Sequence, residues 1–142
     1  MKKILIPVDG SDFSMRAVEK GAEIAKEMNS EIVLLNAVER VTFDEDEKEN
    51  ELVASKHLKR RSEKALAKGK AILDNLNISN VKMVSEVADA DDAIVDYADK
   101  HAMDLVIMGS QGLNAGKIKG IFVGSVTRKV IYQCDIPILI VK

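Results

Sequence analysis

A cluster of glycines towards the C-terminal end of the chain is the sequence feature most typical of chemistry. Five of the eight glycines fall within sixteen residues, at Gly109, Gly112, Gly116, Gly120 and Gly124. Glycine lets backbone amides approach an anion with no Cβ in the way, and a helix that follows adds unpaired N–H groups and a partial positive charge. The cluster therefore predicts a phosphate site, although glycines also gather in ordinary surface loops.

Two common nucleotide motifs are absent from the places where they would be needed. Residues 112–118 have only three residues between their glycines and an isoleucine after the lysine, whereas a Walker A loop needs four residues and a Ser or Thr for magnesium. The dinucleotide pattern G-x-G-x-x-G does not follow the first apolar run. The sequence thus excludes a P-loop and argues against NAD.

Alternating apolar runs and amphipathic segments should position these glycines. Short apolar runs predict strands at residues 2–8, 31–38, 81–87, 105–108 and 136–141. Helical periodicity and caps predict helices at residues 14–28, 51–76, 90–100 and 124–133. This alternation favours a doubly wound α/β fold with a parallel sheet, in which ligands lie at the carboxyl ends of the strands. Asp9, directly after the first strand, should then face the glycines that follow the fourth.

Length, charge and cysteine content narrow the class of protein. A chain of 142 residues with 46% hydrophobic content fits one domain over residues 1–142. A net charge of −2 argues against nucleic acid as a partner. Cys134 is the only cysteine, which excludes an intramolecular disulfide and suits a cytoplasmic location. The apolar run at residues 4–8 is too short for a membrane span, so no membrane association is expected.

Several segments together resemble the ATP-binding branch of the universal stress protein family. They are MGSQG at residues 108–112, GSV at 124–126 and DIPILIV at 135–141, and the opening MKKILIPVDGSDFSMRAVEKGA is similar to that of the family. The likeness covers nearly the whole chain. It implies a five-stranded parallel sheet in the order 3-2-1-4-5 with helices on both faces, like that of the adenine nucleotide alpha hydrolases.

The resemblance also implies where a nucleotide would lie. ATP, or ADP or AMP, is expected across the ends of the first and fourth strands, with Asp9 against the ribose or a bound Mg²⁺ or Mn²⁺ ion. The adenine would be bordered by Pro7, Val8 and the backbone of Ala37. The residues expected around the phosphates are Gly109, Gly112, Gly124, Ser125 and Val126, and Met108 is expected in the same nucleotide site. Lys117, Lys119 and Arg128 are weaker candidates for the same region. A valine at Gly109 is expected to enter the space of the phosphates.

One departure from the family pattern leaves two functions open. Eleven residues separate Gly112 from Gly124 here, two more than in the family's ATP-binding motif. If both ends of the loop still reach the phosphates, we expect an ATP-dependent regulatory switch or sensor in the stress response. If they do not, the protein is a nucleotide-free dimeric interaction module.

Enzyme activity is not predicted beyond slow ATP hydrolysis or autophosphorylation. No general base or nucleophile can be identified for a dedicated hydrolase. A phospho-receiver is disfavoured because Gly10 stands where a second acid is needed, and an ATP pyrophosphatase because the first turn lacks Ser-Gly-Gly.

The last strand should form an interface between two copies. It runs from Ile136 to Val141, is apolar on both faces and is expected at a sheet edge, where unpaired backbone groups attract another chain. The family often dimerises there, so an antiparallel homodimer is predicted, and no other protein partner is.

Overall fold

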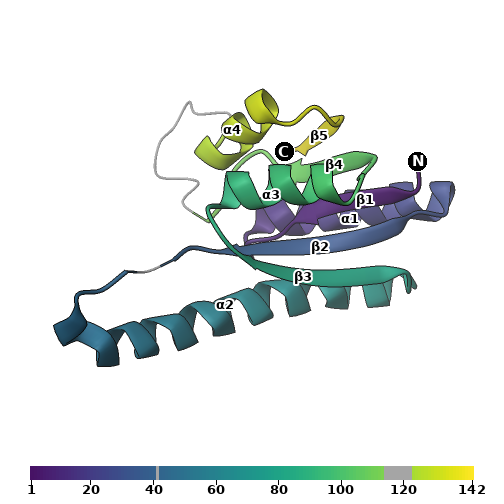
Figure 1. Ribbon diagram of the computed structural model, residues 1–142. Helices are drawn as coiled ribbons and strands as arrows, with labels where there is room; N and C mark the ends of the chain where they lie inside the picture. The colour runs from purple at the N-terminus through teal and green to yellow at the C-terminus, as the bar shows by residue number, and fades with distance from the viewer. Residues whose placement is uncertain (41, 114–122) are drawn as a thin grey trace.

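A five-stranded parallel sheet runs through the middle of the molecule (Figure 1). The computed structural model describes residues 1–40, 42–113 and 123–142. The strands are β1 (Lys3–Pro7), β2 (Glu31–Val38), β3 (Val81–Val87), β4 (Leu105–Gly109) and β5 (Ile138–Val141). Their order is β3-β2-β1-β4-β5 and every neighbouring pair is parallel, which confirms the expected doubly wound sheet.

Helices cover both faces of the sheet and enclose two apolar cores (Figure 1). The helices are α1 (Asp12–Met28), α2 (Lys48–Asn75), α3 (Ala90–Lys100) and α4 (Ser125–Gln133), and a short 3-10 helix, η1 (Glu45–Glu47), precedes α2. Side chains alternate along each strand, so Ile4 and Ile6 of β1 pack with α1 and α2 while Leu5 packs with α3 and α4. Among the described residues, none of these helices is long and apolar enough to span a bilayer.

Element boundaries differ from the prediction where a local group decides them. Helix α1 begins at Asp12 because the Ser11 side chain accepts a hydrogen bond from the amide of Ser14 at 3.2 Å, as a helix N-cap does. Strand β5 begins at Ile138, two residues later than expected, since Pro137 has no N–H to donate to a ladder. Helix α2 begins at Lys48, three residues earlier than expected.

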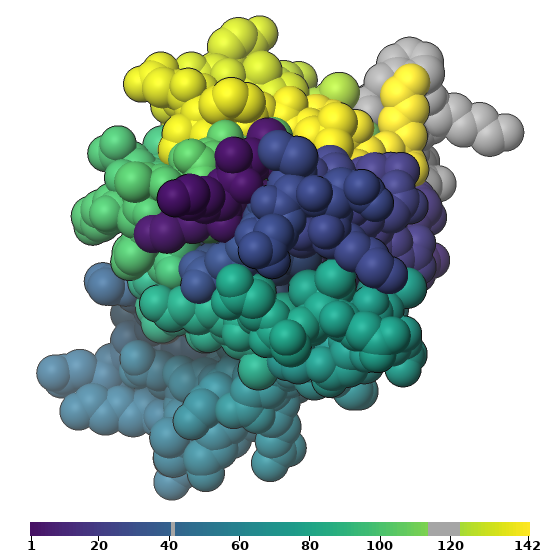
Figure 2. Space-filling model, turned by 90° about the vertical axis from the view of Figure 1, so that its right-hand side faces the viewer, coloured from purple at the N-terminus to yellow at the C-terminus, as the bar shows by residue number. Residues whose placement is uncertain are grey.

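The two chain ends are held at opposite ends of the sheet, and the first residues (purple) lie at the surface between segments coloured blue and green (Figure 2). One oxygen of Asp104 accepts hydrogen bonds from the amides of Lys2 and Lys3, at 2.8 and 2.9 Å. These two bonds lower the pKa of Asp104 below its ordinary value, and the bond from Lys2 has the larger effect. Arg16 of α1 donates from Nε to the backbone oxygen of Lys142 at 3.0 Å. The Asp104 contacts lie where β1 and β4 begin, whereas the Arg16 contact lies just beyond the carboxyl end of β5.

Candidate functional site

A cavity of about 450 Å³ opens at the carboxyl ends of β1, β2 and β4, beside the first turn of α4. All ten residues expected around a nucleotide line it: Pro7, Val8, Asp9, Ala37, Met108, Gly109, Gly112, Gly124, Ser125 and Val126. They come from four separate segments that the sheet order places side by side. The structure therefore assembles them into one cavity, while their role in nucleotide binding stays a prediction.

Asp9 stands at the end of β1 and faces the loop after β4. Its Oδ1 accepts a hydrogen bond from the amide of Ser11 at 2.9 Å, which closes the turn into α1. Gly10 has a φ of +87°, a conformation that side chains rarely adopt. The other oxygen, Oδ2, lies only 2.6 Å from the position that a Cβ on Gly112 would take. Asp9 thus both forms the turn and points one carboxylate oxygen across the gap to Gly112.

Gly109 also has a packing role that the sequence did not suggest. A Cβ built on it would lie 2.8 Å from Cβ of Phe13 and 2.9 Å from the backbone carbonyl carbon of Phe13. The missing side chain of Gly109 therefore makes room for the first turn of α1. The expectation that a valine at this position would enter phosphate space is wrong, because its side chain would point at the backbone of α1.

The first turn of α4 offers backbone donors to the cavity. The Gly124 amide donates to the carbonyl of Ser110 at 2.7 Å, and the first amide of the turn to bond within the helix is that of Arg128, which donates to the Gly124 carbonyl at 3.0 Å. The three amides between those of Gly124 and Arg128 have no helical carbonyl four residues before them, so the helix itself cannot satisfy them. Those residues, Ser125, Val126 and Thr127, all line the cavity. The helix end thus suits an anion.

The lining divides into an apolar part and a polar part. Val8, Leu35, Ile94, Met108 and Val126 supply aliphatic surface of the kind that packs against a flat ring. On the polar side lie Asp9, the glycines of the loop, the start of α4 and Arg128. A ligand with one aromatic end and one anionic end matches both parts.

Two buried residues that hold the site together were not identified from the sequence. Asn36, on β2, donates from Nδ2 to the carbonyl of Val8 at 2.7 Å, and Thr127 donates from Oγ1 to the carbonyl of Gly109 at 2.9 Å. Asn36 thus binds the residue that follows β1, and Thr127 binds the last residue of β4. A lone polar residue inside the apolar run of β2 was the available signal for Asn36, whereas nothing local pointed to Thr127.

Other candidates from the sequence fall outside this geometry or outside the described residues. Gly116, Gly120, Lys117 and Lys119 lie among the residues the structure does not describe. Within residues 1–40, 42–113 and 123–142, no three His, Cys, Asp or Glu side chains gather as a metal site. Asp9 is a single carboxylate at the cavity, and such a donor set suits Mg²⁺ or Mn²⁺ only together with phosphate oxygens and water.

Comparisons with known proteins agree with this architecture. The model of the universal stress protein family matches residues 1–142. A universal stress protein of Methanocaldococcus jannaschii, MJ0531, is 34% identical over 143 residues, which cover 99% of this chain and 82% of that protein.

Solved structures share the fold. Universal stress protein UspA from Lactobacillus plantarum matches with a TM-score of 0.86 at 23% identity, over 99% of this chain and 97% of that one. The universal stress protein from Archaeoglobus fulgidus in complex with dAMP matches with a TM-score of 0.71 at 18% identity, over 100% and 98%. The family match over the whole length decides the assignment: this chain belongs to the universal stress protein family.

Proposed function

We propose that this protein binds an adenine nucleotide, in the first place ATP, and acts as a nucleotide-dependent switch or sensor in the stress response. One observation carries the proposal: the cavity lies where the strand order reverses, between β1 and β4, and combines an apolar wall with the amide-rich start of α4. A family member of the same fold was solved with dAMP, which fits the same division of the cavity.

Each part of the lining has a role in the proposed complex. The base packs between Val8, Ala37 and Met108, with the backbone of β2 at its edge. The phosphates are bound by amides of the loop at Gly112 and of α4 at Ser125 and Val126. Asp9 contacts the ribose or a Mg²⁺ ion held jointly with the phosphates. The metal would screen the phosphate charges, and the residues of the chain would orient the nucleotide.

The switch acts through the segment that joins the two halves of the site. Thr127 ties α4 to the end of β4, so a ligand that bridges Asp9 and α4 stabilises one arrangement of both elements. Among the described residues that line the cavity, none has the geometry of a general base beside a nucleophile. We therefore propose at most slow hydrolysis or autophosphorylation, in a cytoplasmic protein whose residues 1–142 act as one domain.

A homodimer through β5 belongs to the same proposal. Strand β5 is at the edge of the sheet and its four residues are only half-buried. Tyr132 lies on α4, the helix that precedes β5 in the chain, and its side chain is 84% exposed. Antiparallel pairing of two β5 strands would satisfy the free backbone groups and cover this surface. Light scattering at micromolar concentration is expected to give the mass of two chains.

Thermal unfolding with and without nucleotide tests the binding proposal. At about one hundred times Kd a ligand adds about 2.7 kcal/mol of stability, which is about 5–10 °C in Tm for a domain of this size. The Asp9→Ala variant should require about tenfold more ATP for the same shift in Tm. This loss of ATP affinity should be smaller when EDTA replaces magnesium. Asp96→Ala, a change of an exposed carboxylate on α3 outside the cavity, is the matched control.

Failure has a defined form. If millimolar ATP with magnesium leaves Tm unchanged in the wild type, the longer segment between Gly112 and Gly124 no longer supports phosphate binding. The protein is then the nucleotide-free dimeric module.

A further inference from the structure

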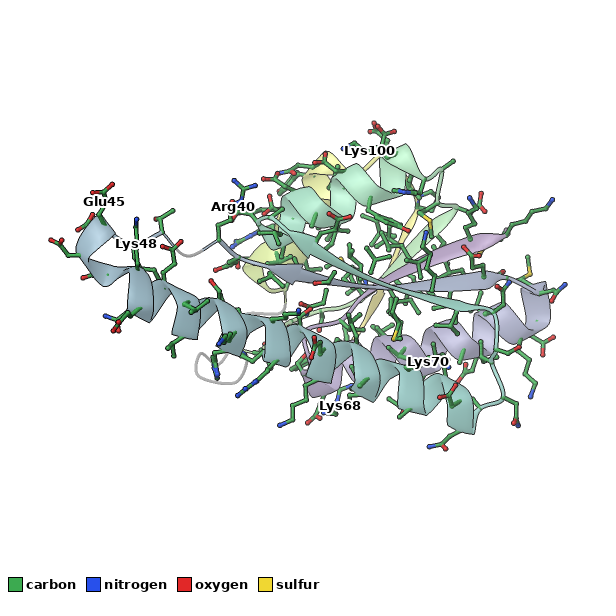
Figure 3. The ribbon with its side chains drawn as sticks, turned by 60° about the horizontal axis from the view of Figure 1, so that its bottom comes forward. Arg40, Glu45, Lys48, Lys68, Lys70 and Lys100 are labelled. Carbon is green, nitrogen blue, oxygen red and sulfur yellow. The ribbon has the colours of Figure 1, made fainter. Side chains whose placement is uncertain are left out.

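The first turns of the long helix α2 project beyond the sheet as an arm (Figures 1 and 3). We define the α2 arm as residues 44–61, which include η1. The first buried residue of α2 is Ser62, whose hydroxyl contacts that of Ser85 on β3 at 3.0 Å. Glu45 and Lys48 lie at the far end of the arm, away from the rest of the molecule (Figure 3). The arm lies outside the cavity, so the nucleotide proposal does not explain it.

Charge along the α2 arm is separated into two blocks of opposite sign. Residues 44–51 contain six acidic residues and one lysine, whereas residues 56–61 contain four basic residues and no acid. The acidic block suits the positive end of the helix, but the basic block in the middle of α2 has no such explanation. In the part of the chain that the structure describes, the ion pairs are Lys20–Glu23 and Lys70–Asp74, both outside the arm.

Two exposed apolar side chains lie between the blocks. Leu52 is 57% exposed and Val53 is 68% exposed. Helical spacing places both on one face with Glu49, Lys56 and Arg60, since these positions follow one another at three- and four-residue steps. From its N-terminal end onward, this face is therefore acidic, then apolar, then basic.

Such a face is complementary to itself when a second copy lies against it in the opposite direction. We propose that the α2 arms of two copies pair antiparallel, with Glu49 of each copy facing Arg60 of the other. The centre of symmetry then lies between residues 54 and 55. The two Val53 side chains are offset by only about 4.5 Å along the axis, at a rise of about 1.5 Å per residue, and can touch. Leu52 of each copy flanks them.

A second copy fits this face better than other partners. An anionic lipid surface would attract the basic block but repel the acidic block next to it. A twofold contact matches both blocks at once, because each residue pair occurs twice. The paired arms are short, so the association should depend on concentration. The arm lies on the β3 side of the sheet, opposite β5, so arm pairing can join two β5 dimers into a tetramer.

Charge reversal in the full-length protein tests the pairing by sedimentation velocity over a concentration series. Glu49→Lys and Arg60→Glu, each alone, put like charges together at two symmetric places and should weaken arm association about tenfold. An equimolar mixture of the two variants should restore it, because each introduced lysine then meets an introduced glutamate. Leu52→Ser with Val53→Ser should abolish it, and high salt should weaken the wild type.

Controls separate this proposal from the others. All substituted side chains are exposed, so Tm and the ATP-induced shift should match the wild type in every variant. The proposal is overturned if the wild type never sediments as a species larger than the β5 dimer. It is also overturned if Glu49→Lys and Arg60→Glu, each alone, leave the association unchanged. Binding of the basic block to vesicles with anionic lipid, without self-association, overturns it as well.

Discussion

Two glycines that look alike in the sequence should respond in opposite ways to the same substitution. Gly109→Ala and Gly112→Ala each add one methyl group next to the cavity. Among the described glycines, Gly10 is the one with a positive φ, so alanine is conformationally allowed at both positions and only the space differs. At Gly109 the methyl group meets Phe13 at 2.8–3.0 Å, including backbone atoms, whereas at Gly112 it meets Oδ2 of Asp9 at 2.6 Å.

These contacts set the expected magnitudes. Backbone of α1 cannot move aside cheaply, so Gly109→Ala should cost about 1–3 kcal/mol of unfolding free energy, or roughly 3–10 °C in Tm. The Asp9 carboxylate is the end of a flexible side chain, so Gly112→Ala should change Tm by about 1–2 °C at most. The displaced carboxylate should instead reduce ATP affinity about tenfold if Asp9 contacts the nucleotide or its metal.

Urea unfolding and ATP titration, carried out on both variants, read the two effects separately. The reasoning is refuted if Gly109→Ala keeps the stability of the wild type while it loses ATP binding, since Gly109 would then border the phosphates after all. It is equally refuted if Gly112→Ala destabilises the fold as much as Gly109→Ala does.

Two further substitutions probe the contacts that hold the site and the sheet. Thr127→Val keeps the shape of a buried side chain but removes the hydrogen bond to the Gly109 carbonyl, and it should cost about 1–3 kcal/mol in urea unfolding and reduce the ATP-induced shift. A Thr127→Ser variant, which retains the hydroxyl, should recover the ATP-induced shift, and failure to do so would contradict the role given to the bond. Asp104→Asn should lower stability at neutral pH, because the amides of Lys2 and Lys3 lower the pKa of Asp104 and so stabilise the folded state while the carboxylate is charged. That contribution is present above the ordinary carboxyl pKa and is lost as pH falls through the lowered value, so the wild-type and variant stabilities should converge in acid; a constant difference down to low pH would contradict the linkage.

Local patterns determined much of the architecture. An apolar run between turn formers marked β2 at its observed bounds, because a strand buried in a parallel sheet must be apolar over its length. The predicted bounds of β3 also match, although this edge strand contains three polar residues and is largely exposed. The alternation of strands and helices then predicted parallel pairing and a site at the carboxyl ends. Glycines after β4 and a carboxylate after β1 identified the segments that line the cavity, since phosphate chemistry uses these residue types at such strand ends.

The tertiary structure alone decided what each of these residues does. Gly109 and Gly112 are equivalent in any local pattern, yet one accommodates Phe13 of α1 and the other accommodates Asp9. Asn36 and Thr127 act on carbonyl groups 28 and 18 residues away, and the exposure of the α2 arm depends on where the sheet ends. Such contacts depend on how whole elements pack. Sequence spacing records the faces of one helix or strand, but not which distant backbone lies against them.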